Sequence, residues 1–366
     1  MCEVMHHSSD ALQKGEKFRN SNLELLRILS ALFVIVIHYV NKDIGKAFAY
    51  TEFMPAHYKV LLIAKMVSIC AVNVFVIICG YFRCTSTCSQ AWKVIRLYID
   101  VMICNALLFF VSCACGYDTF SIRSFLGSIL PVNWYVAVYS GLHLISPYLN
   151  RIIRNQSRKQ FQTMLLVFFL VFSVWPSGVD LFGKVFDFPS KALTPISSTS
   201  SGDGYTLVNF ILLYFVGAYF RVHMTETPST KKCIQGLLLY FGITVINTLY
   251  AAYSPGRAAA YCNPLVIFQA AALFAIFLNL QIRSKAINAI ASCSFGTYLM
   301  HGFFYQYFQI EKYVTGSVWV IPIHMAFCAI LIYVVCALIY GAYQKLFSLL
   351  FSWLQQKLSS LSFDAF

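Results

Sequence analysis

The chain has 366 residues, of which 59% are hydrophobic and only 11% are charged, with a formal net charge of +13. Soluble domains contain about 45–50% apolar and about 25% charged residues, so the composition excludes a soluble protein of this length. The basic excess does not indicate a nucleic-acid-binding protein, because the basic residues fall in alternate loops between apolar runs, as in membrane proteins.

Ten apolar runs are long enough to span a bilayer, and each is predicted to be a helix because its apolarity is continuous rather than alternating. The runs cover residues 23–42, 58–82, 92–115, 133–150, 161–176, 205–222, 234–252, 264–281, 290–308 and 318–342. We therefore predict an all-α polytopic membrane protein with about ten transmembrane helices. Residues 22–353 are predicted to form one transmembrane domain between two cytoplasmic tails, residues 1–21 and 354–366.

The loops between these runs alternate in charge, which predicts the orientation. One set is rich in basic residues: Lys14, Lys17, Arg19, Arg83, Lys93, Arg151, Arg154, Arg158, Lys159, Arg221, Lys231, Lys232, Arg283, Lys285, Lys345 and Lys357. The other set has fewer basic residues and more acidic ones, such as Asp43 and Glu52. Because basic loops stay in the cytoplasm, both termini are predicted to be cytoplasmic.

The first run contains two polar residues, Arg27 and His38, that a lipid-spanning helix seldom carries. Eleven positions of helix return to nearly the same face, about 16 Å further along the axis. Arg27 lies near the cytoplasmic end, where it either has a functional role or reaches lipid phosphates with its long side chain. His38 lies deeper, toward the outer half, and is either functional or a hydrogen-bonded structural imidazole.

Arginines near the cytoplasmic ends of the second and third runs suggest a phosphorylated ligand. Arg83 and Arg96 would bind its phosphates, because guanidinium suits phosphate geometry, or would only anchor the helices by the positive-inside rule. Asn73 is a further polar residue of the second run.

Candidate residues for an acceptor lie in later runs. Trp134 and Tyr135 begin the fourth run, where they form either an ordinary interfacial belt or a platform for a sugar ring. His301 lies in the middle of the ninth run, as a second proton-handling group or as a structural partner of another helix. Most of the 13 cysteines lie inside apolar runs, and no metal site is predicted.

Four motifs occur in a fixed order along nearly the whole chain. They are Arg27-x10-His38, VNVFVIICGYF at 72–82, NWYVAVYSGLHLISPYLN at 133–150 and FGTYLMH at 295–301. Together they resemble the membrane-bound acyltransferase-3 family, which O-acylates bacterial surface glycans and related molecules. Cys79 stands where this family usually has serine, and the position is small in either case.

The resemblance implies a multi-pass enzyme of the bacterial inner membrane. Its donor would be acyl-coenzyme A, most simply acetyl-coenzyme A, with no bound cofactor. Its acceptor would be a hydroxyl of a cell-surface polysaccharide or of a lipid-linked precursor. His38 would act as the general base or carry the acyl group transiently, and Arg27 would orient the thioester or bind the donor phosphates. The substrate-binding candidates are Asn73, Arg83, Arg96, Trp134, Tyr135 and His301.

Two rival functions belong to other classes of membrane protein. A transporter or glycan exporter would use Arg27, His38 and His301 along its substrate pathway. The absence of paired broken helices in matching halves of the sequence argues against it. A structural subunit of a glycan-synthesis complex would tolerate conservative changes such as Arg27→Lys.

Overall fold

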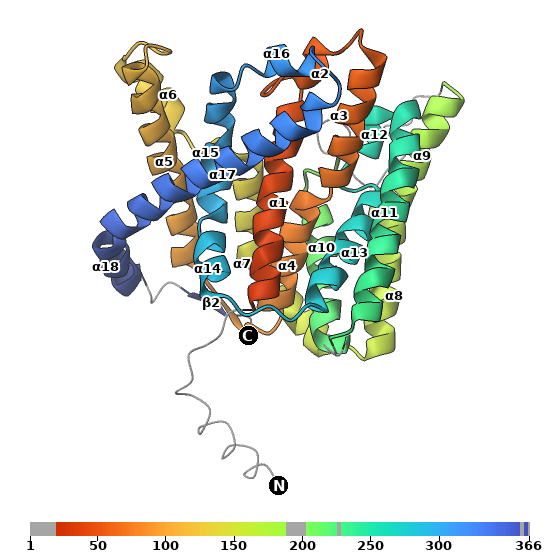
Figure 1. Cartoon of the computed structure of the whole chain (residues 1–366). Coiled ribbons are helices and arrows are strands. Elements are labelled where there is room, and N and C mark those ends of the chain that lie inside the picture. Colours follow the sequence, from red (N-terminus) through yellow and green to blue (C-terminus); the bar gives the residue numbers. More distant parts are fainter. Residues whose placement is uncertain (1–19, 188–202, 225–227, 359–361, 365–366) are drawn as a thin grey trace.

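The structure is a computed structural model that describes residues 20–187, 203–224, 228–358 and 362–364. All but the last two residues of the predicted N-terminal tail, 1–21, lie outside these ranges. Long helices run side by side between two ends of the molecule (Figure 1). The predicted all-α class is confirmed, with one small sheet added to it.

The elements of the first half are α1 (Ser21–Val40), α2 (Ala47–Tyr50), α3 (Pro55–Ser68), α4 (Ala71–Arg83), β1 (Cys88–Gln90), α5 (Ala91–Ala114), α6 (Ile122–Ile129), α7 (Trp134–Arg154), α8 (Arg158–Phe169), the π-helix η2 (Leu170–Val174) and α9 (Trp175–Val185). Those of the second half are α10 (Leu207–His223), α11 (Thr230–Tyr253), α12 (Pro255–Ala258), α13 (Pro264–Leu278), α14 (Lys285–Ala291), α15 (Ser294–Phe304), the 3₁₀-helix η5 (Tyr305–Tyr307), α16 (Ile310–Val314), α17 (Val320–Leu346), α18 (Ser348–Leu358) and β2 (Ser362–Asp364).

Six helical segments of the described chain are long and apolar enough to cross a membrane. They are Ser21–Val40, Pro55–Arg83, Ala91–Ala114, Arg158–Val185, Thr230–Tyr253 and Val320–Leu346. The pair α6 and α7, bent by 45°, would make a seventh, and α10 and α13 are shorter apolar helices. These lengths establish several candidate spans, and the total of ten stays a prediction.

Three of the predicted runs differ from the observed helices because a local irregularity lies inside each. The ninth run, 290–308, is interrupted at residues 292–293 between α14 and α15, and it ends in the 3₁₀-helix η5. The second run breaks into α3 and α4 at Ile69 and Cys70. The fifth run was predicted to end at Pro176, but the helix continues to Val185. Proline is tolerated there because it lies in the first turn of α9, directly after the π-helix, where its missing N–H disturbs the ladder least.

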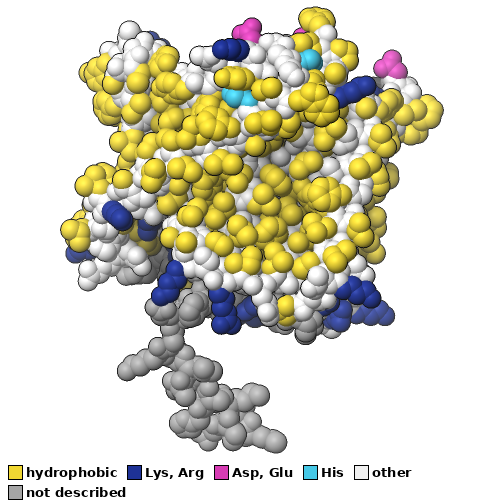
Figure 2. All heavy atoms as spheres, in the orientation of Figure 1, with side chains coloured by type: hydrophobic (Ala, Val, Ile, Leu, Met, Phe, Trp, Pro, Cys, Tyr) yellow, Lys and Arg dark blue, Asp and Glu magenta, His cyan; other side chains and the backbone are white. Residues whose placement is uncertain are grey.

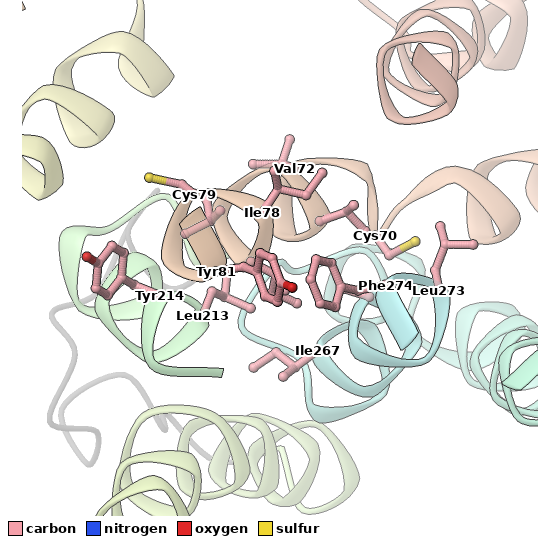
Figure 3. Close-up of a cluster of buried hydrophobic side chains, with 14 of the residues drawn as sticks. Cys70, Val72, Ile78, Cys79, Tyr81, Leu213, Tyr214, Ile267, Leu273 and Phe274 are labelled. Carbon is pink, nitrogen blue, oxygen red and sulfur yellow. The ribbon is translucent and has the colours of Figure 1, made fainter. Parts of the chain in front are cut away.

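Three helices, α4, α10 and α13, form the centre of one apolar core (Figure 3). The backbones of α4 and α10 touch at two glycines. A Cβ on Gly80 would lie 2.1 Å from the Tyr214 carbonyl oxygen, and one on Gly217 would lie 2.1 Å from that of Ile77. Such small-residue contacts let membrane helices pack at their closest distance.

Part of the predicted C-terminal tail, 354–366, is built into the fold. Helix α18 continues to Leu358, and β2 then pairs antiparallel with β1, which precedes α5. Strands of three residues carry no alternation long enough to read from sequence, so the pair was not predicted.

The two ends of the bundle differ in charge. On the face drawn in Figure 2, hydrophobic side chains cover the middle, most Lys and Arg side chains gather at the lower end, and the visible Asp and Glu side chains lie at the upper end. The start of α1, α14 and β2 lie at the lower end in Figure 1, and α2, α6 and α16 lie at the upper end.

Candidate functional site

Two histidines that are far apart in sequence meet inside the bundle. His38 of α1 and His301 of α15 have ring centroids 4.9 Å apart, with ring planes tilted by 46°. The His301 side chain is buried, and His38 is half-buried. This contact joins the first and the last of the four sequence motifs.

The hydrogen bonds of His301 fix which ring nitrogen carries the proton in the neutral ring. Its Nδ1 lies 2.8 Å from the Tyr298 carbonyl oxygen and 3.2 Å from that of Thr297. A carbonyl only accepts, so Nδ1 is the donor and Nε2 keeps a free lone pair. Within the described residues, neither Nε2 of His301 nor the buried Nδ1 of His38 has a hydrogen-bond partner. Buried polar atoms without partners are rare in folded proteins, so these two ring nitrogens are available to hydrogen-bond a further group.

A cavity of about 550 Å³ approaches the histidine pair from the end where α1 begins. We call it the arginine cavity, and its polar lining residues are Arg27, Cys79, Arg96, Tyr135, Tyr139, Ser292, Ser294, Tyr298 and Gln344. Val34 and Tyr298 also line it, and they lie about one helical turn before His38 and His301. The cavity therefore reaches from two cations to within one turn of the histidines.

Arg27 is held against α1 and α4. Its Nη1 donates to Oε1 of Glu24 at 2.9 Å and to Oε2 at 3.1 Å, and its guanidinium lies 5.4 Å from the centre of the Phe82 ring. The side chain remains 32% exposed. A guanidinium has five N–H donors, so this pairing orients Arg27 and leaves donors for a ligand.

The other two predicted arginines separate in the structure. Arg96 lines the arginine cavity, with Nε 3.9 Å from Oδ2 of Asp100. Arg83 is not among the residues that line either cavity described here. Its Nη2 donates to the Ser146 hydroxyl at 3.0 Å, which ties α4 to α7.

A second, larger cavity of about 1190 Å³ lies on the other side of the histidine pair. We call it the carboxylate cavity, and its charged lining residues are Asp43, Lys46, Asp118, Glu311 and Lys312. Gly302 and Tyr305, which follow His301, also line it. So does Gly45, whose N–H donates to the His38 carbonyl at 2.9 Å. The histidine pair thus lies between two cavities of different chemistry.

The walls of the carboxylate cavity hold charged groups outside direct ion pairs with described residues, and their backbone is locally strained. Asp43, Lys46 and Glu311 form no ion pair with another described residue. Lys46 and Gln309 have φ angles of 60° and 47°, in the left-handed region that residues other than glycine seldom adopt. Such strain is concentrated at functional sites, because the surrounding structure must hold it in place.

The three remaining candidates lie in different surroundings. Tyr135 lines the arginine cavity and packs on Tyr298, with ring centroids 5.1 Å apart. Trp134 does not line that cavity and packs between Tyr205 and Tyr261, with ring centroids 4.4 and 5.9 Å away. Its ring also meets that of Tyr135 edge-on, with centroids 5.9 Å apart, so their role as a sugar platform stays a prediction. Asn73 is fully buried, donates to the Tyr261 carbonyl at 2.8 Å, and lines neither cavity.

Sequence analysis missed two groups of residues. Tyr298 precedes His301 by three positions inside the motif at 295–301, and that helical spacing could have placed both on one face. The charged lining of the carboxylate cavity comes from loops and short helices, which have no periodicity to read. Among the described residues, no group of three or more His, Cys, Asp or Glu side chains is arranged to hold a metal ion.

The fold is a helical bundle with several helices long and apolar enough to cross a membrane, and two histidines from distant motifs meet inside it. The sequence model of the acyltransferase-3 family, described as an acyltransferase domain, matches residues 20–341. The chain belongs to this family, so the resemblance is confirmed and the protein is an acyltransferase with a donor and an acceptor substrate. No curated protein and no solved structure matches the chain.

Proposed function

We propose that the protein is a membrane-bound O-acyltransferase. It transfers a short acyl group, acetyl in the simplest case, from acyl-coenzyme A to a hydroxyl of a cell-surface polysaccharide or of its lipid-linked precursor. The observation that carries this proposal is the position of His38 and His301 between two cavities of different chemistry.

The arginine cavity is the donor site in this proposal. Acyl-coenzyme A carries several phosphates, and the guanidinium groups of Arg27 and Arg96 supply planar N–H donors for them. The thioester would extend from these arginines toward Val34 and Tyr298, near the histidines. That path follows α1 for about 16 Å, the rise of eleven helical residues.

The carboxylate cavity is the acceptor site. Its mixture of carboxylates, amides and aromatic rings suits a ligand with many hydroxyl groups, because carboxylates accept their hydrogen bonds. The aromatic members, Tyr117, Phe303 and Tyr305, offer apolar faces for the C–H side of a sugar ring.

The reaction joins the two sites at the histidine pair. His38 takes the proton of the acceptor hydroxyl as that oxygen attacks the thioester carbonyl carbon. The carbon–sulfur bond then breaks, and the coenzyme A thiolate takes up the proton. In the alternative route, a His38 nitrogen first accepts the acyl group and then passes it to the acceptor oxygen.

We propose further that residues 22–353 cross the bacterial inner membrane about ten times, with both termini in the cytoplasm. Successive long helices alternate in direction in Figure 1, and the basic end in Figure 2 holds the start of α1. This orientation opens the arginine cavity toward cytoplasmic coenzyme A and the carboxylate cavity toward the envelope.

The decisive experiment is coenzyme A release by the purified full chain in detergent. Wild-type protein is expected to release coenzyme A from acetyl-coenzyme A when the host's surface glycan is present. His38→Ala should lower the rate by about 10²–10⁴-fold, the usual contribution of a general base. His57→Ala is the control, because that imidazole bonds to the Gly316 carbonyl outside the bundle centre.

Two outcomes would overturn the assignment. An exporter would leave the thioester intact under all conditions. Retention of wild-type glycan acylation by His38→Ala in native membranes would remove His38 from the mechanism.

A further inference from the structure

The C-terminal end of the described chain lies beyond the family match, which stops at residue 341, and yet it reaches the arginine cavity. Gln344, near the end of α17, lines the cavity directly. Phe351 of α18 lies under Arg96, with the guanidinium carbon 4.6 Å from the ring centre. Both contacts fall on the side where the donor phosphates are proposed to bind.

A buried carboxylate connects this segment to Arg96. Tyr343 donates its hydroxyl to Oδ1 of Asp100 at 2.7 Å, and Tyr340 donates to Oδ2 at 3.0 Å. Arg96 lies one turn before Asp100 on α5, with Nε 3.9 Å from Oδ2. The Asp100 side chain is only 6% exposed, so its orientation is set by these three groups. The two tyrosines of α17 thereby fix the carboxylate that faces Arg96.

Helix α18 adds an aromatic contact to the same guanidinium. Phe351 is 4% exposed and also packs on Tyr343, with ring centroids 5.8 Å apart. An aromatic face attracts a cation and excludes water from one side of it. Arg96 is therefore held between a carboxylate and a ring.

Strand β2 holds the start of α5 in place. It pairs with β1, and Gln90, the last residue of β1, directly precedes α5. The Ser89 hydroxyl of β1 donates to the His143 carbonyl of α7 at 2.7 Å. The C-terminal strand thus fixes, through β1, the end of α5 that carries Arg96.

We propose that Tyr343, Gln344, α18 and β2 form a C-terminal clamp that completes the donor site. The clamp holds the Arg96 guanidinium in the geometry that binds the phosphates of the nucleotide part of acyl-coenzyme A. It acts by positioning Arg96 and takes no part in the transfer step. The inference rests on the proposed function, because that function assigns the donor to the arginine cavity.

The test compares two donors, acetyl-coenzyme A and acetyl-pantetheine, which has the same thioester and no phosphate. Phe351→Leu and removal of residues 359–366 should raise KM for acetyl-coenzyme A about tenfold and leave kcat within twofold. Neither change should alter the kinetics with acetyl-pantetheine. Arg96→Gln should give the same pattern, and adding Phe351→Leu to it should have no further effect.

The controls separate this pattern from unfolding. Leu349→Ala changes a residue of α18 that is 82% exposed, and it should leave both donors unaffected. A calorimetric titration with free coenzyme A gives affinity without turnover, and Phe351→Leu should weaken it by the same factor.

Two kinds of result have different meanings. The clamp is wrong, and the proposed function stands, if wild-type protein uses or binds acetyl-coenzyme A and the clamp variants do so equally well. The same conclusion follows if the clamp variants lose activity with acetyl-pantetheine as much as with acetyl-coenzyme A. If wild-type protein neither binds coenzyme A nor consumes its thioester, the proposed function falls and the clamp falls with it.

Discussion

The two histidines can hold at most one extra proton between them. Two imidazolium cations with ring centroids 4.9 Å apart would repel each other strongly in the interior of the bundle. The hydrogen bonds of His301 to backbone carbonyls keep its Nε2 free in the neutral ring. In the proposed mechanism the pair would therefore act as a base that accepts one proton and shares it, with His301 as the partner of His38.

Replacement of His301 tests this partnership. His301→Gln should lower kcat about 10²-fold, because a second proton-handling group is lost, and should leave KM for acetyl-coenzyme A nearly unchanged. The double variant with His38→Ala should be no slower than His38→Ala alone. The rate of acceptor-dependent coenzyme A release is measured for His301→Gln, His38→Ala and the double variant. Independent, multiplicative losses would show that the two histidines act separately.

Arg27 and Arg83 form a matched pair for testing the donor site. Arg27→Gln removes a cation that lines the arginine cavity and should raise KM for acetyl-coenzyme A about 10–100-fold, the usual cost of a lost charged hydrogen bond. Arg83→Gln removes a contact between α4 and α7 and should mainly lower the thermal midpoint. Steady-state kinetics and thermal unfolding in detergent separate the two effects, and equal KM increases would contradict the placement of the donor.

At the residue scale, sequence alone identified single positions better than pairs. Arg27 and His38 stand out because polar groups inside apolar runs are costly. The contact between His38 and His301 joins positions 263 apart, and it depends on how α1 packs against α15. No property of either run encodes that packing, so the contact between His38 and His301 could be identified only from the three-dimensional structure.

At the element scale, the contact between α4 and α10 depends on the absence of side chains at Gly80 and Gly217. Carbonyl oxygens occupy the places where their Cβ atoms would lie, and backbone cannot move aside as a side chain can. The contact also sets the position of Cys79, beside Gly80, in the wall of the arginine cavity.

Alanine substitution tests this contact with an internal control. Gly217→Ala should destabilise the protein by about 1–3 kcal/mol, the usual cost of overpacking a core. Gly242→Ala on α11 should be neutral or stabilising, because nothing lies within 4 Å of its Cβ position and alanine favours helix. Thermal unfolding in one detergent compares them. Equal midpoints would mean that α4 and α10 are further apart.

Helices were predicted correctly where the apolar run was continuous, and breaks and strands were missed where the irregularity was local or the element was only a few residues long. The long helices follow from their composition alone. The break at Ile69 and Cys70 lies between Lys65 and Asn73 of the second run, and no Gly or Pro stands there to mark it. Pro176 predicted a helix end, but the helix continues past it because the π-helix directly before Pro176 accommodates the proline. The pairing of β1 with β2 joins segments more than 270 residues apart, and no local pattern predicts it.

At the scale of the whole molecule, helix length alone is an incomplete guide to topology. Helix α13 has 15 residues, a rise of about 22 Å, which is shorter than the roughly 30 Å hydrocarbon core. Most of its residues are buried against α4 and α11 rather than exposed to lipid. A helix covered by neighbours does not need to match the bilayer by itself, since those neighbours satisfy its ends.

The sidedness of the loops around α10 and α13 therefore decides between ten crossings and fewer. Cysteines are introduced one at a time into a background in which the thiols that are not buried, and Cys2, are replaced by serine: Cys2, Cys88, Cys113, Cys115, Cys233 and Cys293. Labelling on intact cells with a membrane-impermeant maleimide then reports the sidedness directly. Gly256→Cys and Thr315→Cys should react from outside, whereas Lys231→Cys and Arg283→Cys should react only after permeabilisation; all four positions are exposed. If α13 entered and left on one side, Gly256→Cys and Arg283→Cys would react alike. That result would also place the two mouths of the bundle on one side, and donor and acceptor could then no longer approach the histidine pair from opposite compartments.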